Sequence, residues 1–348
     1  MKKKLFTASI IGLMFLSSCS KDDKMNTTLK RNYPAAYVVN GEDATVSVIK
    51  LSTNEVTETI PLMGTGTDMI MWPHHISSHS NHLAIGVPGM DFSGGHSGST
   101  TGMSGKMLIL DATNGAIIKN INLPLMNHNT IYSPNGTEIW VPQMDNDGKV
   151  LVYDATTYAL KNTINVGMMP AELTFSSDGT KAYVANGDDD TVSVINVSTK
   201  AVVATVTVGD NPVGAWTGTN GQMFVDNEDG QSISVIKVSD NTIAQTIALG
   251  FMPGIASHNG IKSELWVSDP MAGKVHYWTW DAGMMMWMHS GVFNTGAGAH
   301  AISFTTDGNT AYVTNQTANT VSVVNVTNHT VTKTINVGKK PNGVVIKM

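Results

Sequence analysis

Short apolar runs, rich in valine, isoleucine and threonine, fill the chain from Ala35 to its end. A typical segment is "AYVANGDDDTVSVINVSTKAVVATVTVG" from Ala182, in which each run is bounded by Gly, Asn, Asp or Ser. Runs this short and this rich in β-branched residues are typical of strands rather than helices. The pattern predicts an all-β domain.

The same pattern occurs seven times. "AYVVNGEDATVSVIK" from Ala36 and "AYVTNQTANTVSVVN" from Ala311 are clear copies of the segment above, and three other copies, from Ile139, Met223 and Leu265, are more divergent. The seventh copy, "LAIGV" from Leu83, resumes at "KMLILDATNG" after a Gly- and Ser-rich insertion. Periods of 40 to 50 residues with several strands per unit are typical of β-propellers. Equivalent positions, 47, 56, 43, 41, 42 and 46 residues apart, are Val38, Ile85, Val141, Val184, Val225, Val267 and Val313.

The two ends of the repeat region complement each other. Internal units open with a strand like "PAELTFSSDG" from Pro170, but the first unit begins at its second strand. The missing strand is found at the other end, in "PNGVVIKM", Pro341 to Met348. Pairing both ends in one blade closes the ring and protects its sheet edges. Residues 35–348 are therefore predicted to form a seven-bladed β-propeller, with blade one completed by the C-terminal strand.

The strings "AYVTN", "AYVAN", "TVSVI" and "TINVG" resemble the YVTN family of seven-bladed β-propellers, including surface-layer types, over essentially all of residues 35–348. The resemblance implies the fold. It does not select a function, because propellers carry binding, scaffolding and catalytic roles alike.

The N-terminus predicts export and lipidation. "MKKKLFTASIIGLMFLSSC" has a basic start and a short apolar run that ends at Cys19, the one cysteine of the chain. "LSSC" resembles a bacterial lipobox, which implies a signal peptide over residues 1–18, lipid on Cys19 and a lipidated tether over residues 19–34. "CSKDD" resembles the surface-export tag of Bacteroidota lipoproteins. We therefore expect an outer-membrane lipoprotein of the bacterial envelope, held at the membrane by its lipid; the periplasmic and the external face both stay open, and the export-tag resemblance favours the external one.

Charge narrows the choice of partners. The whole chain carries a formal charge of −6, and loss of residues 1–18 removes three lysines and makes it −9. An acidic body with no basic patch argues against nucleic acid. The expected partner is a protein or a small ligand at one propeller face.

Histidines cluster at one place in the repeat. The stretch "MWPHHISSHSNH", Met71 to His82, holds four of the eleven histidines. Alignment of the innermost strands places His74, His128 and His300 at the start of the strand nearest the axis, with His75 next in line. We expect these four side chains to meet at one mouth of the central channel, beside Asn342 of blade one.

Methionines occupy the same ring. Met126, Met169 and Met252 lie two residues before the aligned position on their blades. Thioether and imidazole ligands together suit copper, especially Cu(I), better than Ca²⁺ or Mg²⁺. The paired histidines at an inner strand also resemble the copper-cluster propeller of nitrous oxide reductase, although that enzyme's full histidine set and its cysteine-containing domain have no counterpart here. The competing interpretation is that the methionines fill the hub and the histidines bond to the backbone.

Catalytic motifs are absent from the sequence. It contains no G-x-S-x-G, H-E-x-x-H, C-x-x-C-H or phosphate-binding loop. The sequence therefore favours a lipid-anchored binding or interaction module over an enzyme. The alternative is a copper-binding or redox-associated protein that uses the His/Met mouth. A propeller hydrolase such as a lactonase ranks third, because no nucleophile or acid–base set is visible.

Overall fold

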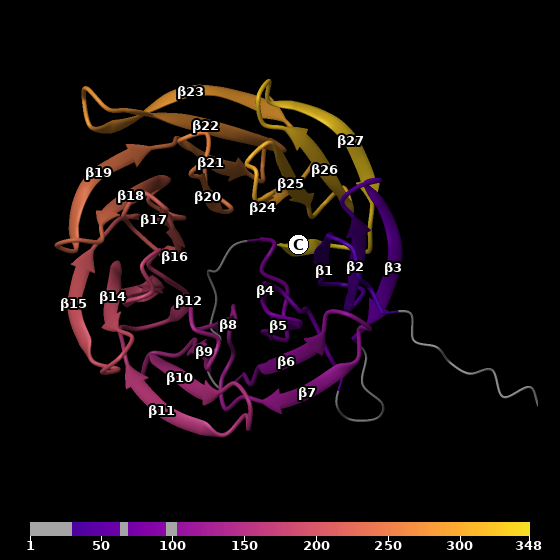
Figure 1. The fold of residues 1–348 in the computed structure, drawn as a ribbon. Coiled ribbons are helices and arrows are strands. Elements are labelled where there is room, and N and C mark those ends of the chain that lie inside the picture. The colour runs from indigo at the N-terminus through magenta and orange to yellow at the C-terminus, as the bar shows by residue number, and fades with distance from the viewer. Residues whose placement is uncertain (1–29, 63–68, 95–102) are drawn as a thin grey trace, which may run out of the picture.

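A computed structural model describes residues 30–62, 69–94 and 103–348. These residues form seven four-stranded antiparallel sheets arranged in a ring, which is a seven-bladed β-propeller (Figure 1). The predicted fold and the number of blades are confirmed. In the described part of the chain, no helix is long and apolar enough to cross a membrane; one short 3₁₀ turn, η1, spans Gly187–Asp189.

Each blade runs from an inner strand at the axis to an outer strand at the rim. Blade one consists of β28 (Pro341–Lys347), β1 (Ala35–Asn40), β2 (Thr45–Lys50) and β3 (Glu55–Pro61). Blade two consists of β4 (Ile76–His79), β5 (His82–Val87), β6 (Lys106–Asp111) and β7 (Ile117–Asn122). Blade three consists of β8 (Ile131–Tyr132), β9 (Glu138–Gln143), β10 (Lys149–Asp154) and β11 (Leu160–Asn165). Blade four consists of β12 (Pro170–Phe175), β13 (Lys181–Asn186), β14 (Thr191–Asn196) and β15 (Val202–Thr207). Blade five consists of β16 (Pro212–Thr217), β17 (Gln222–Asn227), β18 (Ser232–Lys237) and β19 (Thr242–Ala248). Blade six consists of β20 (Ala256–Asn259), β21 (Glu264–Asp269), β22 (Lys274–Asp281) and β23 (Met286–Asn294). Blade seven consists of β24 (Ala299–Phe304), β25 (Thr310–Asn315), β26 (Thr320–Asn325) and β27 (Thr330–Asn336).

The burial of the strands explains their composition. The two middle strands of each blade are covered on both faces by neighbouring blades, so β1 and β13 are almost fully buried and read as continuous apolar runs. Outer strands such as β3 and β11 are mostly exposed and read as polar. Apolar clusters join facing strands of adjacent blades all around the ring, for example Tyr183 and Val194 with Val225. The hydrophobic core is therefore a series of layers between blades.

The repeated letters "N…T-x-S" have a structural cause. At the end of β13, the Asn186 amide donates to the hydroxyls of Thr191 and Ser193 on the next strand, both at 3.0 Å. A Cβ on Gly167, which leaves the preceding blade, would come within 2.7 Å of this amide. Four blades share this arrangement, which we call the asparagine clamp. Its asparagines and glycines are Asn40 with Gly338, Asn186 with Gly167, Asn227 with Gly209, and Asn315 with Gly296.

Ring closure occurs as predicted. β28 pairs with β1 from Ala35↔Lys347 to Asn40↔Pro341, with one register shift after Val38. Contacts begin before β1, because Arg31 is buried, donates from Nε to the Ala112 carbonyl at 2.8 Å and pairs with Glu58. The predicted tether thus already contacts the propeller at Arg31. Cys19 and the predicted signal peptide lie outside the described residues.

Candidate metal centre at the channel mouth

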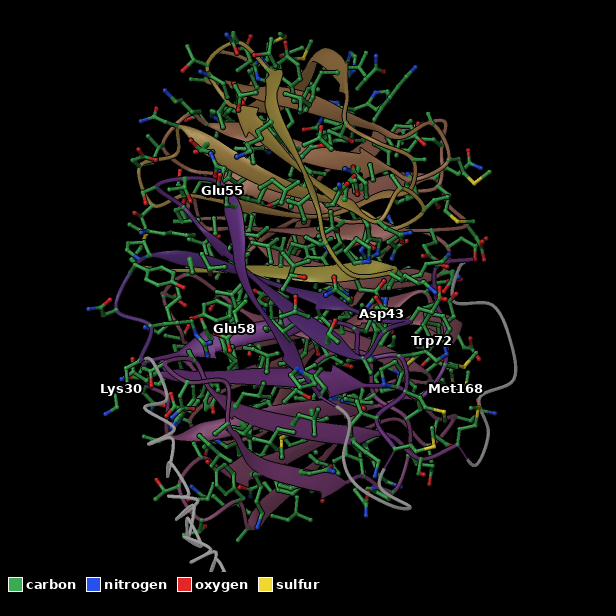
Figure 2. The ribbon with its side chains drawn as sticks, turned by 90° about the vertical axis from the view of Figure 1, so that its right-hand side faces the viewer. Lys30, Asp43, Glu55, Glu58, Trp72 and Met168 are labelled. Atoms are coloured by element: carbon green, nitrogen blue, oxygen red, sulfur yellow. The ribbon has the colours of Figure 1, made fainter. Side chains whose placement is uncertain are left out.

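Inner strands enter the channel at one face of the ring, where the linkers between blades and the loops between the second and third strands also lie. In the side view, Asp43, Trp72 and Met168 lie on this side, whereas Glu55 and Lys30 lie on the opposite side (Figure 2). His74 and His75 directly precede β4, His128 precedes β8, and His300 is the second residue of β24. The structure therefore places the four predicted histidines at the same mouth.

Two glycines let the histidine segments approach one another. A Cβ on Gly86 of β5 would lie 2.6 Å from the His128 carbonyl oxygen, and a Cβ on Gly343 of β28 would lie 2.8 Å from that of His74. Real Cβ atoms do not come that close, so larger residues at either position would push the linkers apart. The His74 N–H also donates to the Gly86 carbonyl at 2.8 Å, which fixes the linker to β5.

Three imidazoles form the centre of the group. Ring centroids lie 4.1 Å apart for His74 and His128, 4.5 Å for His74 and His75, and 4.8 Å for His75 and His128. One nitrogen from each ring lies within 4.8 Å of the others, and the three residues are 1%, 8% and 1% exposed. Nitrogens that share one ion at about 2.0–2.1 Å stand at most about 4.2 Å apart, so small ring rotations are enough for joint ligation.

A buried carboxylate lies against two of the three rings. Glu172 of β12 is 1% exposed, and its Oε1 lies 2.7 Å from His75 Nε2 and 2.6 Å from His128 Nδ1. Its Oε2 has no hydrogen-bond partner among the residues described, and the His75 contact does not have the direction of an N–H···O hydrogen bond. Three nitrogens and one carboxylate oxygen are a donor set that zinc and copper accept.

His300 and Asn342 border the three rings. The His300 ring lies 5.5 Å from that of His74, and its Nδ1 lies 3.2 Å from the Asn342 carbonyl oxygen. A carbonyl can only accept, so Nδ1 carries the proton and Nε2 keeps a lone pair. The Asn342 amide donates to the Pro73 carbonyl at 3.2 Å, which ties the C-terminal strand to the linker before His74.

The predicted methionines take different positions. Met126 is fully buried in an apolar cluster with Phe92 and Met144, and Met169 packs against that cluster, which we call the methionine layer. The Phe92 ring lies 5.1 Å from His128, so the layer borders the imidazoles. Met252 is 36% exposed, on the same face. Further exposed methionines belong to linkers and loops of this face: Met69, Met71, Met103, Met168 and Met271.

A cavity lies below the imidazoles in the channel. It measures about 80 Å³ and is lined by His75, Glu172, Thr174 and Trp216, among others. Trp216 donates from its indole nitrogen to Asp226, a fully buried residue of β17. Burial raises the pKa of Asp226 well above its ordinary value, and the nearby Glu172 carboxylate raises it further. Burial therefore favours the protonated, neutral form of the Asp226 carboxyl.

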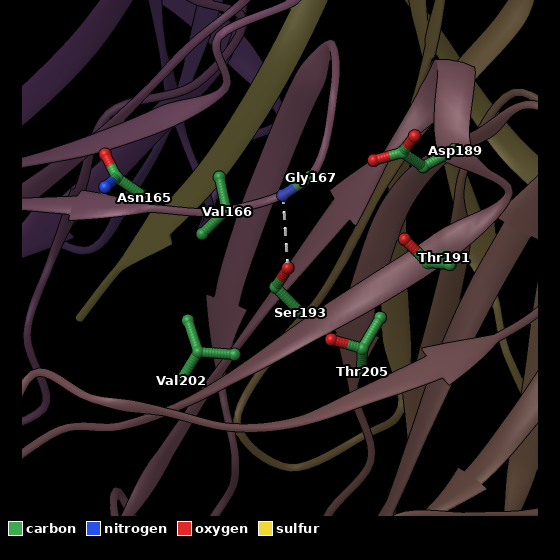
Figure 3. A pocket seen from close by; sticks show the side chains of 8 residues that line it. All are labelled: Asn165, Val166, Gly167, Asp189, Thr191, Ser193, Val202 and Thr205. Atoms are coloured by element: carbon green, nitrogen blue, oxygen red, sulfur yellow. Dashed lines mark hydrogen bonds between the residues drawn. The ribbon is translucent and has the colours of Figure 1, made fainter.

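A larger cavity lies away from the mouth residues. Between blades three and four, a cavity of about 440 Å³ is lined by hydroxyl and aliphatic side chains such as Thr191, Ser193 and Val202 (Figure 3). Its one acidic lining residue, Asp189, already accepts the Met168 N–H at 2.7 Å. This cavity offers no group of titratable side chains, so volume and candidate chemistry are separate in this molecule.

Sequence reasoning missed the two carboxylates of the channel. Glu172 follows Ala171 in "PAELTF", and Asp226 precedes the clamp residue in "MFVDN", where related blades have Val39, Ala185 or Thr314. An acidic residue at a repeat position where the related blades carry none was the available signal. Metal binding by the histidines and methionines remains a prediction.

These features define a seven-bladed β-propeller with a group of buried polar side chains at its channel mouth. The Choice-of-anchor I domain model matches residues 139–342, more than half of the chain, and the chain belongs to that family. Membership indicates a protein associated with the cell surface or envelope.

Solved structures share the fold at low sequence identity. A functionally unknown protein from Desulfotomaculum acetoxidans aligns with a TM-score of 0.71 and 12% identity, covering 90% of this chain and 98% of the other. A putative 6-phosphogluconolactonase from Bacteroides fragilis aligns at 0.70 and 13%, covering 91% and 99%. The periplasmic gluconolactonase of Pseudomonas aeruginosa aligns at 0.69 and 14%, covering 90% and 99%. No curated protein sequence matches this chain.

Proposed function

We propose that this protein is an envelope-anchored binding module whose channel mouth binds a copper ion. The observation that carries the proposal is a group of three buried imidazoles, two of which, His75 and His128, lie against the buried Glu172 carboxylate. The expected ligands are His74, His75, His128 and Glu172, with His300 beside them.

The energetic argument rests on burial. A carboxylate removed from water is costly unless a positive charge or several hydrogen bonds compensate it. Glu172 lies against imidazoles that come from two other blades, and its second oxygen has no partner among the described residues. A divalent or monovalent cation between these side chains would supply the missing positive charge.

The surroundings favour copper over zinc. Thioether sulfur is a soft donor that selects Cu(I), and imidazole binds both copper and zinc. The methionine layer borders His128 through Phe92, and exposed methionines surround the mouth. This face therefore has exposed methionine sulfurs at its surface, which are soft ligands, and buried imidazole nitrogens and a carboxylate oxygen beneath them. Copper bound there would supply reversible one-electron chemistry, while His75 and Glu172 would set its geometry.

Anchoring gives this site its place in the cell. Cys19 follows a signal that resembles a lipobox, and the family indicates the envelope. We infer an outer-membrane lipoprotein, held by lipid on Cys19, whose propeller faces a compartment where copper is met. The likeness to gluconolactonases rests on the fold alone, and the YVTN resemblance likewise supports only the architecture. Replacing Cys19 by serine should release the protein from the membrane fraction; unchanged fractionation of a processed variant would contradict the anchor.

The metal proposal is tested by loading and variants. The purified protein is incubated with Cu(I), Cu(II) or Zn²⁺, freed of excess ion and analysed for bound metal. We expect about one tightly bound copper per chain, lost in the triple variant His74→Ala, His128→Ala, His300→Ala. The matched control carries His79→Ala and His82→Ala, because both residues belong to blade two but lie away from the mouth. Equal copper in the triple variant and the wild type would contradict the proposal.

A further inference from the structure

The junctions between blades have a common corner on the face opposite the histidines. In six blades, the third residue of the second strand is aromatic: Tyr37, Trp140, Tyr183, Phe224, Trp266 and Tyr312. Five of these have a polar atom that is hydrogen-bonded. For example, the Tyr183 hydroxyl donates to Asn241 at 3.0 Å and the Trp266 indole donates to Glu264 at 2.8 Å. Phe224 in blade five is the exception, because it has no polar atom.

At the corner of blade five, a tryptophan from blade six supplies the hydrogen-bonding group that Phe224 lacks. The hairpin of β22 and β23 is longer than its counterparts and carries Trp280 and Trp287 directly opposite each other. The Trp287 ring packs edge-on against Phe224 at 5.4 Å, and its indole N–H donates to Gln222 Oε1 at 2.9 Å. This junction has thus exchanged a tyrosine hydroxyl for an indole from the neighbouring blade.

The hairpin is fixed in place by blade five. Gln245 of β19 accepts from the Trp287 N–H at 2.8 Å and donates to the Trp287 carbonyl at 3.0 Å. The Gln245 side-chain amide thus makes the two hydrogen bonds to the Trp287 backbone that a paired strand would make. The position of the two indoles is therefore preorganised.

The exchange leaves a pocket of about 270 Å³ between blades five and six. Trp280 and Trp287 form its aromatic side, and its polar side consists of Thr219, Asn220, Gln222, His258 and Ser263. At Gly260, a Cβ would lie 2.0 Å from the Thr219 hydroxyl, so the two loops meet only because glycine is present. No lining residue carries a formal charge at neutral pH. By contrast, blades three and four have a second cavity, separate from the one in Figure 3, and its lining includes both Glu138 and Lys200.

Hydrogen-bonding capacity in this pocket is defined. Burial lowers the pKa of His258 to about 4, so the imidazole is neutral at neutral pH. Its Nδ1 accepts from the Thr219 N–H at 3.1 Å, which leaves the proton on Nε2 as a donor. Gln222 Oε1 accepts from Trp287 and, at 2.8 Å, from Asn220, which leaves the Gln222 NH₂ group as a donor. Donors and acceptors are thus both present beside an indole face.

We propose that this pocket between blades five and six binds a neutral polyhydroxylated ligand, a sugar residue. A sugar ring has an apolar face of C–H groups that can lie on Trp280, and hydroxyls at its edge that can both donate and accept. An anion would lose hydration without meeting a positive side chain, so the pocket should reject it. The site lies at the opposite end of the propeller from the histidines and is independent of metal binding.

The test uses the full protein and defined sugars. Glucose, galactose, mannose and N-acetylglucosamine, with glucuronate as the charged comparison, are titrated while indole fluorescence is followed. A small polar ligand should bind with a Kd on the order of 1 mM. Trp280→Ala should weaken binding of the preferred neutral sugar by about tenfold or more, as for buried aromatic contacts elsewhere. Trp72→Ala, a tryptophan at the other face, is the matched control and should bind as the wild type does.

A second variant keeps the fold while changing the pocket. Gln222→Glu retains an oxygen that accepts from Trp287 and Asn220 but removes the NH₂ donor and adds a negative charge, so sugar binding should fall, and a single cooperative thermal transition checks that the variant remains folded. His128→Gln should leave sugar binding unchanged, which separates this site from the metal site. The proposal is overturned if no neutral sugar binds, if glucuronate binds as well, or if Trp280→Ala binds like the wild type.

Discussion

Blades four and seven differ from blades two and three in how they hold the ring together. In the former, the asparagine clamp joins each blade internally and receives a glycine from the blade before it. In the latter, the clamp position holds Val87 or Gln143, and the adjacent linkers carry His74, His75 and His128 instead. Blades four and seven therefore carry a hydrogen-bonded clamp that stabilises the fold. Blades two and three lack this clamp and carry imidazole side chains, which are able to bind a metal, in the adjacent linkers.

The largest effect should come from opening the ring. Deletion of Pro341 to Met348 removes β28, leaves an edge of β1 unpaired and takes Asn342 from the mouth. We expect loss of a single cooperative thermal transition, because a propeller depends on closure. Deletion of Lys21 to Thr28 is the control and should melt like the full chain. Equal melting of both truncations would contradict closure by β28.

Loss of one imidazole should separate binding from stability. His128→Gln removes a ligand from the group of three, and we expect copper affinity to fall by more than about 100-fold, since even outer-shell changes cost 10- to 100-fold. The melting temperature of the metal-free protein should change little. Titration against a competing chelator measures the affinity, and unchanged affinity would remove His128 from the site.

Charge at the mouth can be tested without changing its shape. Glu172→Gln keeps the side chain's size and one oxygen but removes the negative charge beside His75 and His128. Copper affinity should fall by about 10- to 100-fold. Binding in both proteins should weaken on acidification, because protonated imidazole cannot bind a metal. If the Gln variant binds as tightly as the wild type, Glu172 is no ligand.

The clamp should show the opposite behaviour. Asn186→Ala leaves the Thr191 and Ser193 hydroxyls without their donor and should lower the free energy of unfolding by about 1–3 kcal/mol. Copper affinity should stay the same, because the Asn186 side chain bonds to Thr191 and Ser193 rather than to the histidines. Chemical denaturation measures the first effect, and a matching loss of copper would show that clamp and mouth are not separable.

Asp226 gives the smallest and most pH-dependent effect. The folded chain holds its carboxyl proton more tightly than the unfolded chain does, so this residue reduces stability as pH rises above its ordinary pKa of 3.8. Asp226→Asn keeps an oxygen for the Trp216 indole and should be more stable than the wild type at pH 7 in the metal-free state. Below about pH 4 the two should converge. A constant difference at every pH would contradict the assignment of a neutral acid.

Much of this comparison was predictable from the sequence, and the reason is physical. The clamp needs Asn, Thr, Ser and Gly at fixed spacing, so it appears as the repeated strings that gave the number of blades and the strand that closes the ring. The histidines were found by the same register. Glu172 was missed because β12 shifts its register between Pro170 and Leu173, so adjacent residues of this strand do not simply alternate between its faces. Strand counting cannot show such an irregularity. The pocket between blades five and six depends on a long hairpin reaching a neighbouring blade, which no single repeat reveals.

The most direct measurement of the central claim is X-ray absorption at the copper edge on the loaded protein. We predict imidazole scattering from about three histidines, with a nitrogen and oxygen shell near 2.0–2.1 Å, and loss of that signal in His128→Gln. A first shell made of sulfur near 2.3 Å would place copper in the methionine layer instead, and it would contradict a centre built from His74, His75, His128 and Glu172.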